Sequence, residues 1–502
     1  MSTARTIGEL RKSGYKPLPV KDEIRKNLIR KINEKETLFS GIIGYEKTVV
    51  PSLINAILAR HDIMLLGLRG QAKSRIVRLL PTLLDEYIPV MKGCEINDNP
   101  FRPICKSCVD IVERCGDSAE IEWLHRDARL GEKLATPDVT IADLIGDIDP
   151  IKAASQRLNY SHEGAIHFGI IPRTNRGIFA INELPDLQPR IQVGLFNIME
   201  EKDIQIRGFN VRIPLDIMIV FTANPEDYTN RGNIITPLKD RIDSQILTHY
   251  PRTLDDAIQI TQQEAWLQRD GYNMIIPRYF REIIEQIAFE ARKSEFVDQK
   301  SGVSARLTIN AMENLISNAE RRAIATGDKV VVPRICDLSH VLPAMTGKIE
   351  LVFEGEQEGS AKVSKALIGK AVREIFKKYF SDPLQRRSAR TQNPDKLSGS
   401  ESEYQNITAW FEAGNKIDVA DDSSVDDYYK ELNKVKGLRE LVMKQMKLTD
   451  RDRYELASAM EFALDGLHQF SKIAKDEIEH VTSYKDLVGS IFTGKDRNVD
   501  EF

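Results

Sequence analysis

The stretch Met64-Leu-Leu-Gly-Leu-Arg-Gly-Gln-Ala-Lys-Ser74 decides the fold of this chain. A short apolar run, typical of a buried strand, ends at Gly67, and a glycine-rich turn then leads into an amphipathic helix. Backbone N–H groups around Gly70 can cradle an oxyanion, Lys73 can reach the β- and γ-phosphates of a nucleotide, and Ser74 offers a hydroxyl to Mg²⁺. The pattern therefore predicts a phosphate-binding P-loop.

One position of this loop departs from the strict P-loop pattern. A glycine usually precedes the lysine, and here the residue is Ala72. We expect a helix-like backbone at this position, which alanine tolerates, so the departure weakens the match without breaking it. The residues expected to bind the nucleotide in this segment are Gly67, Gly70, Gln71, Ala72, Lys73, Ser74 and Arg75.

Two further apolar runs end in polar residues. Gly177-Ile-Phe-Ala-Ile-Asn-Glu183 ends in an amide and a carboxylate, and Ile217-Met-Ile-Val-Phe-Thr-Ala-Asn-Pro225 carries Asn224 near its end. Buried parallel strands are near-continuous apolar runs, and ligands gather outside their carboxyl ends. Lys73, Glu183 and Asn224 each follow such a run, so we expect one crevice to hold all three.

Together these motifs resemble an AAA+ ATPase of the magnesium chelatase and MoxR group, over residues 39–346. Residues 67–74 look like the Walker A loop, Asn182-Glu183 occupies the Walker B pair, and Thr222-Ala-Asn-Pro225 is similar to sensor 1. Two more segments resemble the family: Phe39-Ser-Gly-Ile-Ile-Gly-Tyr-Glu46, which contains Ile43 and would pack on the adenine, and Arg173-Thr-Asn-Arg-Gly-Ile178, just before the Walker B run.

The resemblance implies ATP as the nucleotide, with Mg²⁺ held by Ser74 and Asn182. Glu183 would polarise the attacking water, and Asn224 would help to position it. Walker B normally ends in Asp-Glu, and a neutral Asn182 supports the metal ion less well than an aspartate does. Two interpretations stay open: a tolerated variant of the family, or a slow ATPase that works as a nucleotide-gated switch.

Two arginines complete the site that the resemblance implies. Leu238-Lys-Asp-Arg-Ile-Asp243 is similar to the arginine-finger segment, in which Arg241 would reach the γ-phosphate bound by the next subunit. Ser304-Ala-Arg-Leu307 looks like the start of a lid helix, with Arg306 at the sensor 2 position. The implied assembly is a homo-oligomeric ring, a hexamer.

The fold class implied is α/β: a P-loop AAA+ three-layer αβα core with a helix-2 insert, followed by an all-α lid and a C-terminal helical region. A β-hairpin is expected at 203–214, because apolar and polar residues alternate there about a glycine-centred turn. The expected parts are an N-terminal helical segment (1–38), the AAA+ core (39–250) with a helix-2 insert (140–172), the all-α lid (251–350), a helix and linker (351–403) and a C-terminal helical domain (404–502).

Four of the five cysteines cluster in a second insert of the core, expected at 91–135. Cys105-Lys-Ser-Cys108 has zinc-knuckle spacing, and Cys94 and Cys115 flank it at ten and six intervening residues. Four thiolates would close a tetrahedral structural Zn²⁺ site. The alternative is a group of unpaired or redox-sensitive surface thiols, because the flanking spacings match no standard zinc finger.

Bulk properties indicate a large intracellular protein. At 502 residues with 41% hydrophobic and 29% charged residues, the chain can form several cored domains. A net charge of −4 and a pI near 6.2 give no signal for nucleic acid. The first ten residues lack an apolar signal core, and no run of about 18 apolar residues predicts a membrane segment, so we expect a cytoplasmic protein.

Three functions remain open at this point. The first is a ring-forming ATPase that remodels or activates a partner in a chelatase-type complex. That partner would carry an adhesion-type metal-binding domain, whose Asp-x-Ser-x-Ser motif does not occur in the C-terminal region of this chain. The second is a MoxR-like chaperone that matures another protein. The third is a weakly hydrolysing switch or scaffold, which Asn182 favours.

Overall fold

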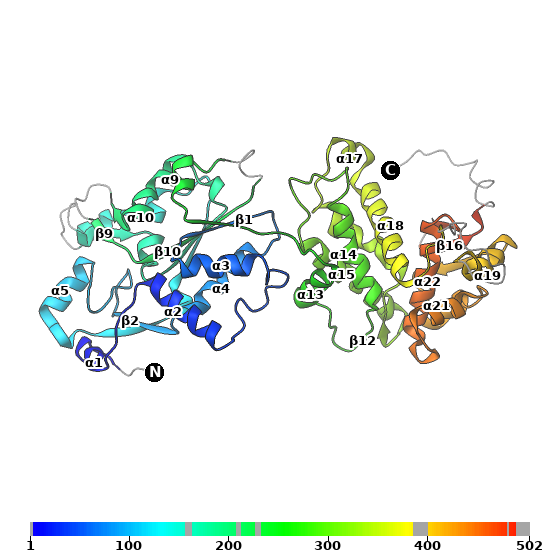
Figure 1. The fold of residues 1–502 in the computed structure, drawn as a ribbon, viewed down its shortest axis with the longest axis horizontal. Coiled ribbons are helices and arrows are strands. Elements are labelled where there is room, and N and C mark those ends of the chain that lie inside the picture. Colours follow the sequence, from blue (N-terminus) through cyan, green and yellow to red (C-terminus); the bar gives the residue numbers. More distant parts are fainter. Residues whose placement is uncertain are drawn as a thin grey trace, which may run out of the picture. The chain divides into compact units, whose positions relative to one another are not determined.

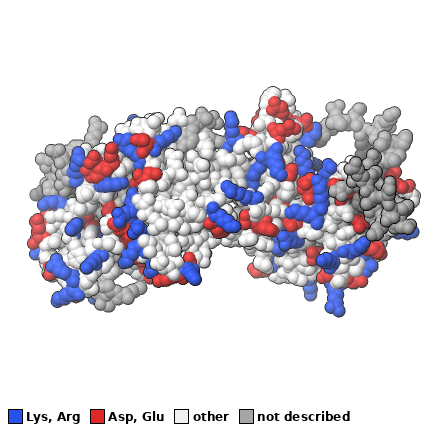
Figure 2. Space-filling view, viewed as in Figure 1, with Lys and Arg blue, Asp and Glu red and all other residues white. Residues whose placement is uncertain are grey.

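The chain divides into two units, Met1–Tyr250 and Pro251–Phe502, each with its own hydrophobic core (Figure 1). The computed structural model describes residues 4–155, 163–206, 212–225, 232–384, 400–478 and 481–487. Charged side chains of both signs are interspersed over the face drawn in Figure 2, in keeping with the net charge of −4. Among the described helices, none combines the length and the apolar character needed to cross a membrane.

A five-stranded parallel sheet forms the centre of the first unit, in the order β11-β1-β10-β7-β4. Its members are β1 (Ile63–Leu66), β4 (Leu130–Leu134), β7 (Gly177–Asn182), β10 (Ile217–Ala223) and β11 (Ser244–Leu247). Parallel neighbours that are not consecutive in sequence require crossover connections, which place helices on the faces of the sheet. The predicted αβα core is confirmed.

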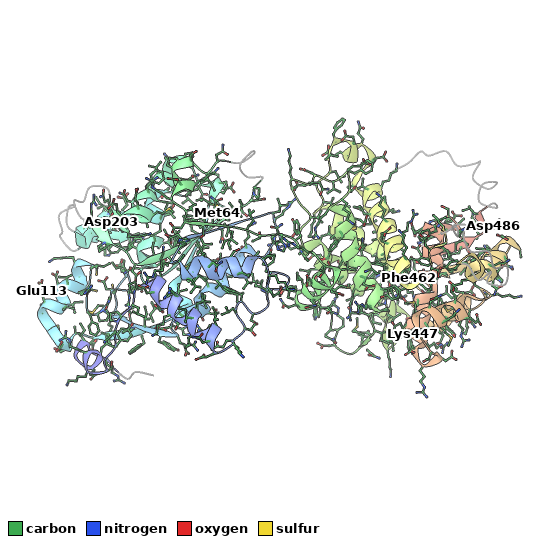
Figure 3. The ribbon with its side chains drawn as sticks, in the orientation of Figure 1. Met64, Glu113, Asp203, Lys447, Phe462 and Asp486 are labelled. Atoms are coloured by element: carbon green, nitrogen blue, oxygen red, sulfur yellow. The ribbon has the colours of Figure 1, made fainter. Side chains whose placement is uncertain are left out.

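The two faces of this sheet bury different side chains, because successive residues of a strand point to opposite sides. In β1, Ile63 and Leu65 belong to one core, and Met64, labelled in Figure 3, belongs to the other. β7 and β10 are almost wholly buried, which explains their near-continuous apolar sequences. The core that contains Ile63 and Leu65 is covered by α2 (Val20–Asn33), α3 (Val49–Leu58) and α4 (Lys73–Leu79). The core that contains Met64 is covered by helices that include α9 (Pro189–Gly194) and α10 (Phe196–Glu200).

An antiparallel ribbon is inserted between α4 and β4. β2 (Tyr87–Met91) pairs with β3 (Ile121–His125), and α5 (Lys106–Cys115) connects them. The N-terminal α1 (Ile7–Lys12) lies against this insert and shares its core. The predicted bounds 91–135 were wrong at both ends: β2 begins earlier, and β4 is a strand of the central sheet. The sequence did not predict β4 as a strand, because it is a half-buried edge strand and therefore lacks an apolar run.

The second insert, predicted at 140–172, contains a short antiparallel pair. β5 (Gly146–Ile148) pairs with β6 (Ile166–Phe168). The predicted hairpin at 203–214 also forms, since β8 (Asp203–Gln205) pairs with β9 (Arg212–Pro214); its turn, 207–211, lies outside the described residues. The helices of this region are α6 (Ile141–Leu144), α7 (Pro150–Ser155), α8 (Ile170–Arg173) and α12 (Thr236–Asp240).

One continuous core runs through the second unit. The ring of Tyr279 in α14 stacks on Phe462 in α22, with 4.5 Å between centroids (Phe462 is labelled in Figure 3). The expected lid and C-terminal domain therefore share one core. The helices are α13 (Leu254–Glu264), α14 (Arg278–Ala291), α15 (Arg306–Thr326), α16 (Leu342–Thr346), α17 (Phe353–Glu358), α18 (Ser360–Tyr379), α19 (Ser400–Glu412), α20 (Val425–Leu432), α21 (Leu438–Met446) and α22 (Arg453–Gln469).

The second unit is mainly helical, as predicted, and it also contains short strands among its helices. Ile417 and Val419 are buried and alternate with more exposed neighbours, as in a strand with one face in a core. This alternating pattern is only four residues long and lies among strongly helical runs, so the sequence did not predict a strand here. The strands are β14 (Ile417–Ala420), β16 (Val481–Lys485) and β15 (Ala474–Ile478), paired antiparallel in that order, and the two-residue pair β12 (Asn273–Met274) with β13 (Val330–Val331).

A buried acid in α14 predicts a pH dependence of stability. Burial raises the pKa of the Glu285 carboxyl from 4.5 to about 7, and Thr261 donates a hydrogen bond to it. Between these values the folded chain binds more protons than the unfolded chain, so the free energy of unfolding should fall as pH rises. The expected loss from pH 5 to pH 8 is about 3 kcal/mol for this group.

Urea unfolding at several pH values checks this prediction. Glu285→Gln should be more stable than the wild type at pH 8 and should lose part of the pH dependence, whereas the exposed Glu295→Gln should keep all of it. Identical pH profiles for the wild type and Glu285→Gln would mean that this carboxyl titrates normally.

Candidate nucleotide-binding site

The predicted P-loop connects the carboxyl end of β1 to the start of α4. The N–H of Gly67 donates to the carbonyl of Ala223 at the end of β10, at 3.2 Å. Gly70 has a φ of 73°, a left-handed conformation that favours glycine. The ammonium of Lys73 donates to the carbonyls of Gly67 and Leu68, which holds this side chain over the loop.

Ala72 corrects the expectation of a helix-like backbone before the lysine. Its φ of 57° and ψ of 15° lie in the left-handed region. Glycine adopts this conformation freely, and for an alanine it costs about 1 kcal/mol or more. The loop therefore stores backbone strain next to Lys73, which explains in physical terms why a glycine is usual at this position.

The strand β11 supplies a wall of the loop that the sequence did not reveal. Thr248 follows this strand, and its hydroxyl donates to Oε1 of the buried Gln71, at 2.7 Å. A Cβ on Gly67 would lie 2.0 Å from the Thr248 hydroxyl and 2.2 Å from the Gln71 oxygen. Gly67 is thus required for the close approach of these groups.

Two tyrosines fix the loop from outside. The hydroxyl of Tyr45 lies 3.0 Å from the carbonyl of Gln71 and 2.7 Å from that of His249. Burial raises the pKa of Tyr45 to about 12, so it stays a hydrogen-bond donor at neutral pH. Tyr250 donates to the carbonyl of Arg69 at 2.9 Å. The Tyr45–His249 and Tyr250–Arg69 bonds join residues 204 and 181 positions apart, which no local pattern could predict. Only the place of residues 248–250 after a parallel strand hints at these contacts.

The other nucleotide-side residues of the prediction surround this loop. Phe39 and Tyr45 of the opening segment are buried in the core below α3 and α4, and Ile43 between them is half-buried. Ser74 is exposed on the first turn of α4, and Arg75 next to it is half-buried. Their contacts with a nucleotide stay a prediction.

The Walker B and sensor 1 segments meet at the ends of two paired strands. Phe221 of β10 lies opposite Ile181 of β7, so the next residues also face one another. The hydroxyl of Thr222 lies 3.3 Å from Oδ1 of Asn182 and accepts a hydrogen bond from the N–H of Glu183, at 3.0 Å. This network fixes the backbone that presents Asn182 and Glu183 at the edge of the sheet.

Glu183 and Asn224 have properties that suit a reactive site. Glu183 is exposed and has a φ of 57°, a strained conformation for a residue other than glycine. Such strain persists where surrounding structure enforces it, and it concentrates at functional sites. Oδ1 of Asn224 is buried and has no hydrogen-bond partner among the described residues. A buried acceptor of this kind needs a hydrogen-bond donor, and a bound water could serve as one.

The two predicted arginines lie in different units. Arg241 follows α12, and its guanidinium donates to Oε2 of Glu200 through Nε and Nη2, at 3.0 and 2.9 Å. It also lies 4.7 Å above the ring of Phe196, with 29% of its side chain exposed. Arg306 is exposed as the first residue of α15, in the second unit.

Three of the four predicted thiols come together, and an aspartate joins them. Ligand atoms of Cys94, Asp98, Cys105 and Cys108 all lie within 4.8 Å of one another. Cys115 is exposed at the last residue of α5. Seven residues of helix, at about 1.5 Å each, separate it from Cys108 by roughly 10 Å. The predicted four-thiol set is therefore wrong in Cys115.

Comparisons with known proteins identify relatives of this chain. No protein-family model matches the chain. The "Magnesium-chelatase subunit ChlI" of Nostoc is 28% identical over 235 residues, 45% of this chain and 58% of the relative. A "Magnesium-chelatase subunit ChlI homolog" of Methanocaldococcus jannaschii is 28% identical over 201 residues, 39% of this chain and 52% of the relative. The chain thus spans just over half the length of these relatives.

A solved assembly of magnesium chelatase subunits BchI and BchD contains a chain with 20% identity and a TM-score of 0.34, over 64% of this chain and 98% of that one. Together with the parallel sheet, these relatives show that the chain resembles the AAA+ ATPases of the magnesium chelatase and MoxR group.

Proposed function

We propose that this protein binds ATP with Mg²⁺ and hydrolyses it, as a ring-forming subunit that remodels or activates a partner protein. The observation that carries the proposal is the convergence of Lys73, Glu183 and Asn224 at the carboxyl ends of three neighbouring parallel strands. Ligands of open α/β sheets bind at this edge. A cation for the phosphates, a carboxylate as base and a polar side chain that positions the water are groups that suit phosphoryl transfer to water.

In the proposed mechanism, Lys73 exchanges its loop carbonyls for the β- and γ-phosphates. Ser74 and Asn182 would hold Mg²⁺, which would offset the charge of the phosphates. Glu183 accepts a proton from the attacking water, and Asn224 orients that water through its amide. Thr222 supports this arrangement before any ligand arrives, because it donates to Oδ1 of Asn182 and accepts from the backbone N–H of Glu183.

The assembly is the finer part of the proposal. Arg241 acts on the γ-phosphate bound by the next subunit, and Arg306 couples the nucleotide to the second unit. Sites of this kind form at the interface of a closed ring, here a hexamer. The partner is a protein with an adhesion-type metal-binding domain. The solved chelatase assembly, in which BchI occurs together with BchD, motivates the search for a second subunit.

Asn182 favours a second candidate function, a nucleotide-gated switch with slow hydrolysis. Its Oδ1 lies 3.3 Å from the hydroxyl of Thr222, and a neutral amide attracts Mg²⁺ less than a carboxylate does. A steady-state ATPase assay separates the two candidates. A turnover that remains near the uncatalysed rate at saturating ATP and Mg²⁺ would select the switch.

Removal of the P-loop cation tests nucleotide binding itself. Lys73→Ala should weaken ATP binding by about a hundredfold or more, because two charge-assisted hydrogen bonds to phosphate are lost. Isothermal titration calorimetry measures this directly. Lys92→Ala is a matched control, since Lys92 is an exposed lysine paired with Glu120. Tight ATP binding by Lys73→Ala would contradict the assignment of the loop.

A further inference from the structure

We propose that Cys94, Asp98, Cys105 and Cys108 bind one structural Zn²⁺ through three thiolates and one carboxylate. The four ligand atoms lie within 4.8 Å of one another, and Sγ of Cys94 lies 4.0 Å from Sγ of Cys105. Tetrahedral zinc with bonds of about 2.3 Å to sulfur places two sulfurs about 3.8 Å apart. A disulfide needs about 2.05 Å, so the spacing suits joint ligation of one ion and not a covalent pair.

Asp98 carries the most specific evidence. Its side chain is fully buried, with 0% exposed. Oδ2 accepts hydrogen bonds from the N–H groups of Ile104, at 3.1 Å, and Cys105, at 3.0 Å. Oδ1 is also buried, and it has no hydrogen-bond partner in the part of the chain that the structure describes. A buried carboxylate oxygen without a partner is strongly unfavourable, whereas a bound cation satisfies it.

The surrounding N–H groups prepare the thiols for metal binding. The N–H of Asp98 donates to Sγ of Cys94, and the N–H of Cys108 donates to Sγ of Cys105, both at 3.4 Å. Cys105 is the N-cap of α5, and a helix N-terminus favours the thiolate form of a cysteine. Hydrogen bonds from groups that do not themselves bind the metal orient the ligand atoms and strengthen the site.

Burial argues for a structural ion and against a catalytic one. Cys105 is 9% exposed and Cys108 is 2% exposed, and they belong to the core shared by the ribbon and α1. Four protein ligands leave no open position on tetrahedral zinc. The ion would act as a staple that fixes the end of β2 and the start of α5, where the loop has little regular structure.

The place of the cluster connects it to the other inserts of the first unit. It borders a cavity of about 300 Å³ that is also lined by Ile166 and Phe168 of β6 and by Ile213 of β9. Lys152 of α7 forms an ion pair of 2.8 Å with Glu95, the residue after Cys94. Loss of the ion should therefore loosen the support of β5, β6 and the β8–β9 hairpin, while the strands of the nucleotide site stay intact.

Metal analysis of the full-length chain, purified without chelators, tests the proposal. The wild type should contain about one zinc per chain, and Cys105→Ser should contain almost none. Asp98→Asn should release zinc to a chromogenic chelator at least about tenfold more readily, as expected for a weakened ligand. Cys115→Ser is the matched control: it removes a thiol of the same helix and should retain the metal of the wild type.

Two further measurements keep the test independent of whether a variant folds. Cobalt-substituted wild type should show the absorption of a tetrahedral site with three thiolates, unchanged in Cys115→Ser. Hydrogen exchange after chelation should rise at residues 91–118 while β1, β7 and β10 stay protected. Zinc-free wild type with an ordered insert, or zinc lost from Cys115→Ser and kept by Asp98→Asn, would overturn the proposal. Neither readout depends on ATP hydrolysis, so the proposed function can fail separately.

Discussion

Replacing Glu183 with glutamine should leave ATP binding nearly unchanged and slow hydrolysis by about a hundredfold or more. Glutamine keeps the size of the side chain and its ability to contact a water, but it cannot accept the proton of that water at neutral pH. The strained backbone at this position has the same cost for both residues, because neither is a glycine. The variant therefore isolates the loss of the base from any change of fold.

Single-turnover measurement of phosphate release, with ATP affinity from calorimetry, separates chemistry from binding. The exposed Glu201→Gln in the same unit is the control for a simple loss of one negative charge, and it should hydrolyse ATP like the wild type. If Glu183→Gln turns over at the rate of the wild type, the base lies elsewhere. If it loses ATP binding as well, Glu183 serves the structure of the loop and not the chemical step.

The central strands of the sheet could be predicted because the burial of each one leaves a pattern within its own short sequence. β7 and β10 are buried on both faces, so each is an apolar run whose end is visible in the sequence. The carboxyl ends of parallel strands meet at one edge, which brings Lys73, Glu183 and Asn224 together without knowledge of the strand order. The same reasoning could not find β4 or β11, because these edge strands carry polar or half-exposed residues.

What the sequence could not predict depends on long-range contacts or on backbone conformation. The hydrogen bonds from Tyr45 to His249 and from Tyr250 to the P-loop residue Arg69 join distant segments. The left-handed backbone at Ala72 follows from how the loop closes and not from the residue itself, since alanine disfavours it. Asp98 was not predicted as a metal ligand for another reason. The spacing of cysteines carries no information about carboxylates, although oxygen and sulfur ligands combine readily on zinc.

The contacts of Arg241 within its own subunit bear directly on the ring model. Its guanidinium pairs with Glu200, which is 58% exposed, and itself lies over the ring of Phe196. An ion pair this exposed contributes little to stability, about 0–1 kcal/mol. The arginine can therefore leave Glu200 at small cost for a phosphate, a stronger partner that accepts several hydrogen bonds. Two roles are distinguishable: a finger that acts on the next subunit, or a local brace for α10 and α12.

Arg241→Ala should reduce the ATPase rate by about a thousandfold if this residue is a finger supplied in trans. Mixing Arg241→Ala with Lys73→Ala subunits should then restore part of the activity. In a randomly mixed ring, about one interface in four pairs an intact P-loop with an intact finger, because each contact joins different surfaces of two subunits.

Glu200→Gln should stay active, since it removes the resting partner of the arginine and leaves the finger. Arg11→Ala, which breaks another exposed arginine–carboxylate pair, controls for the loss of charge. A brace predicts the opposite pattern: Glu200→Gln would be as slow as Arg241→Ala, and the mixture would be no faster than its components. The rate per subunit of the wild type must also rise with protein concentration as rings form, and a dilute monomer that hydrolyses ATP at the full rate would exclude catalysis at a subunit interface.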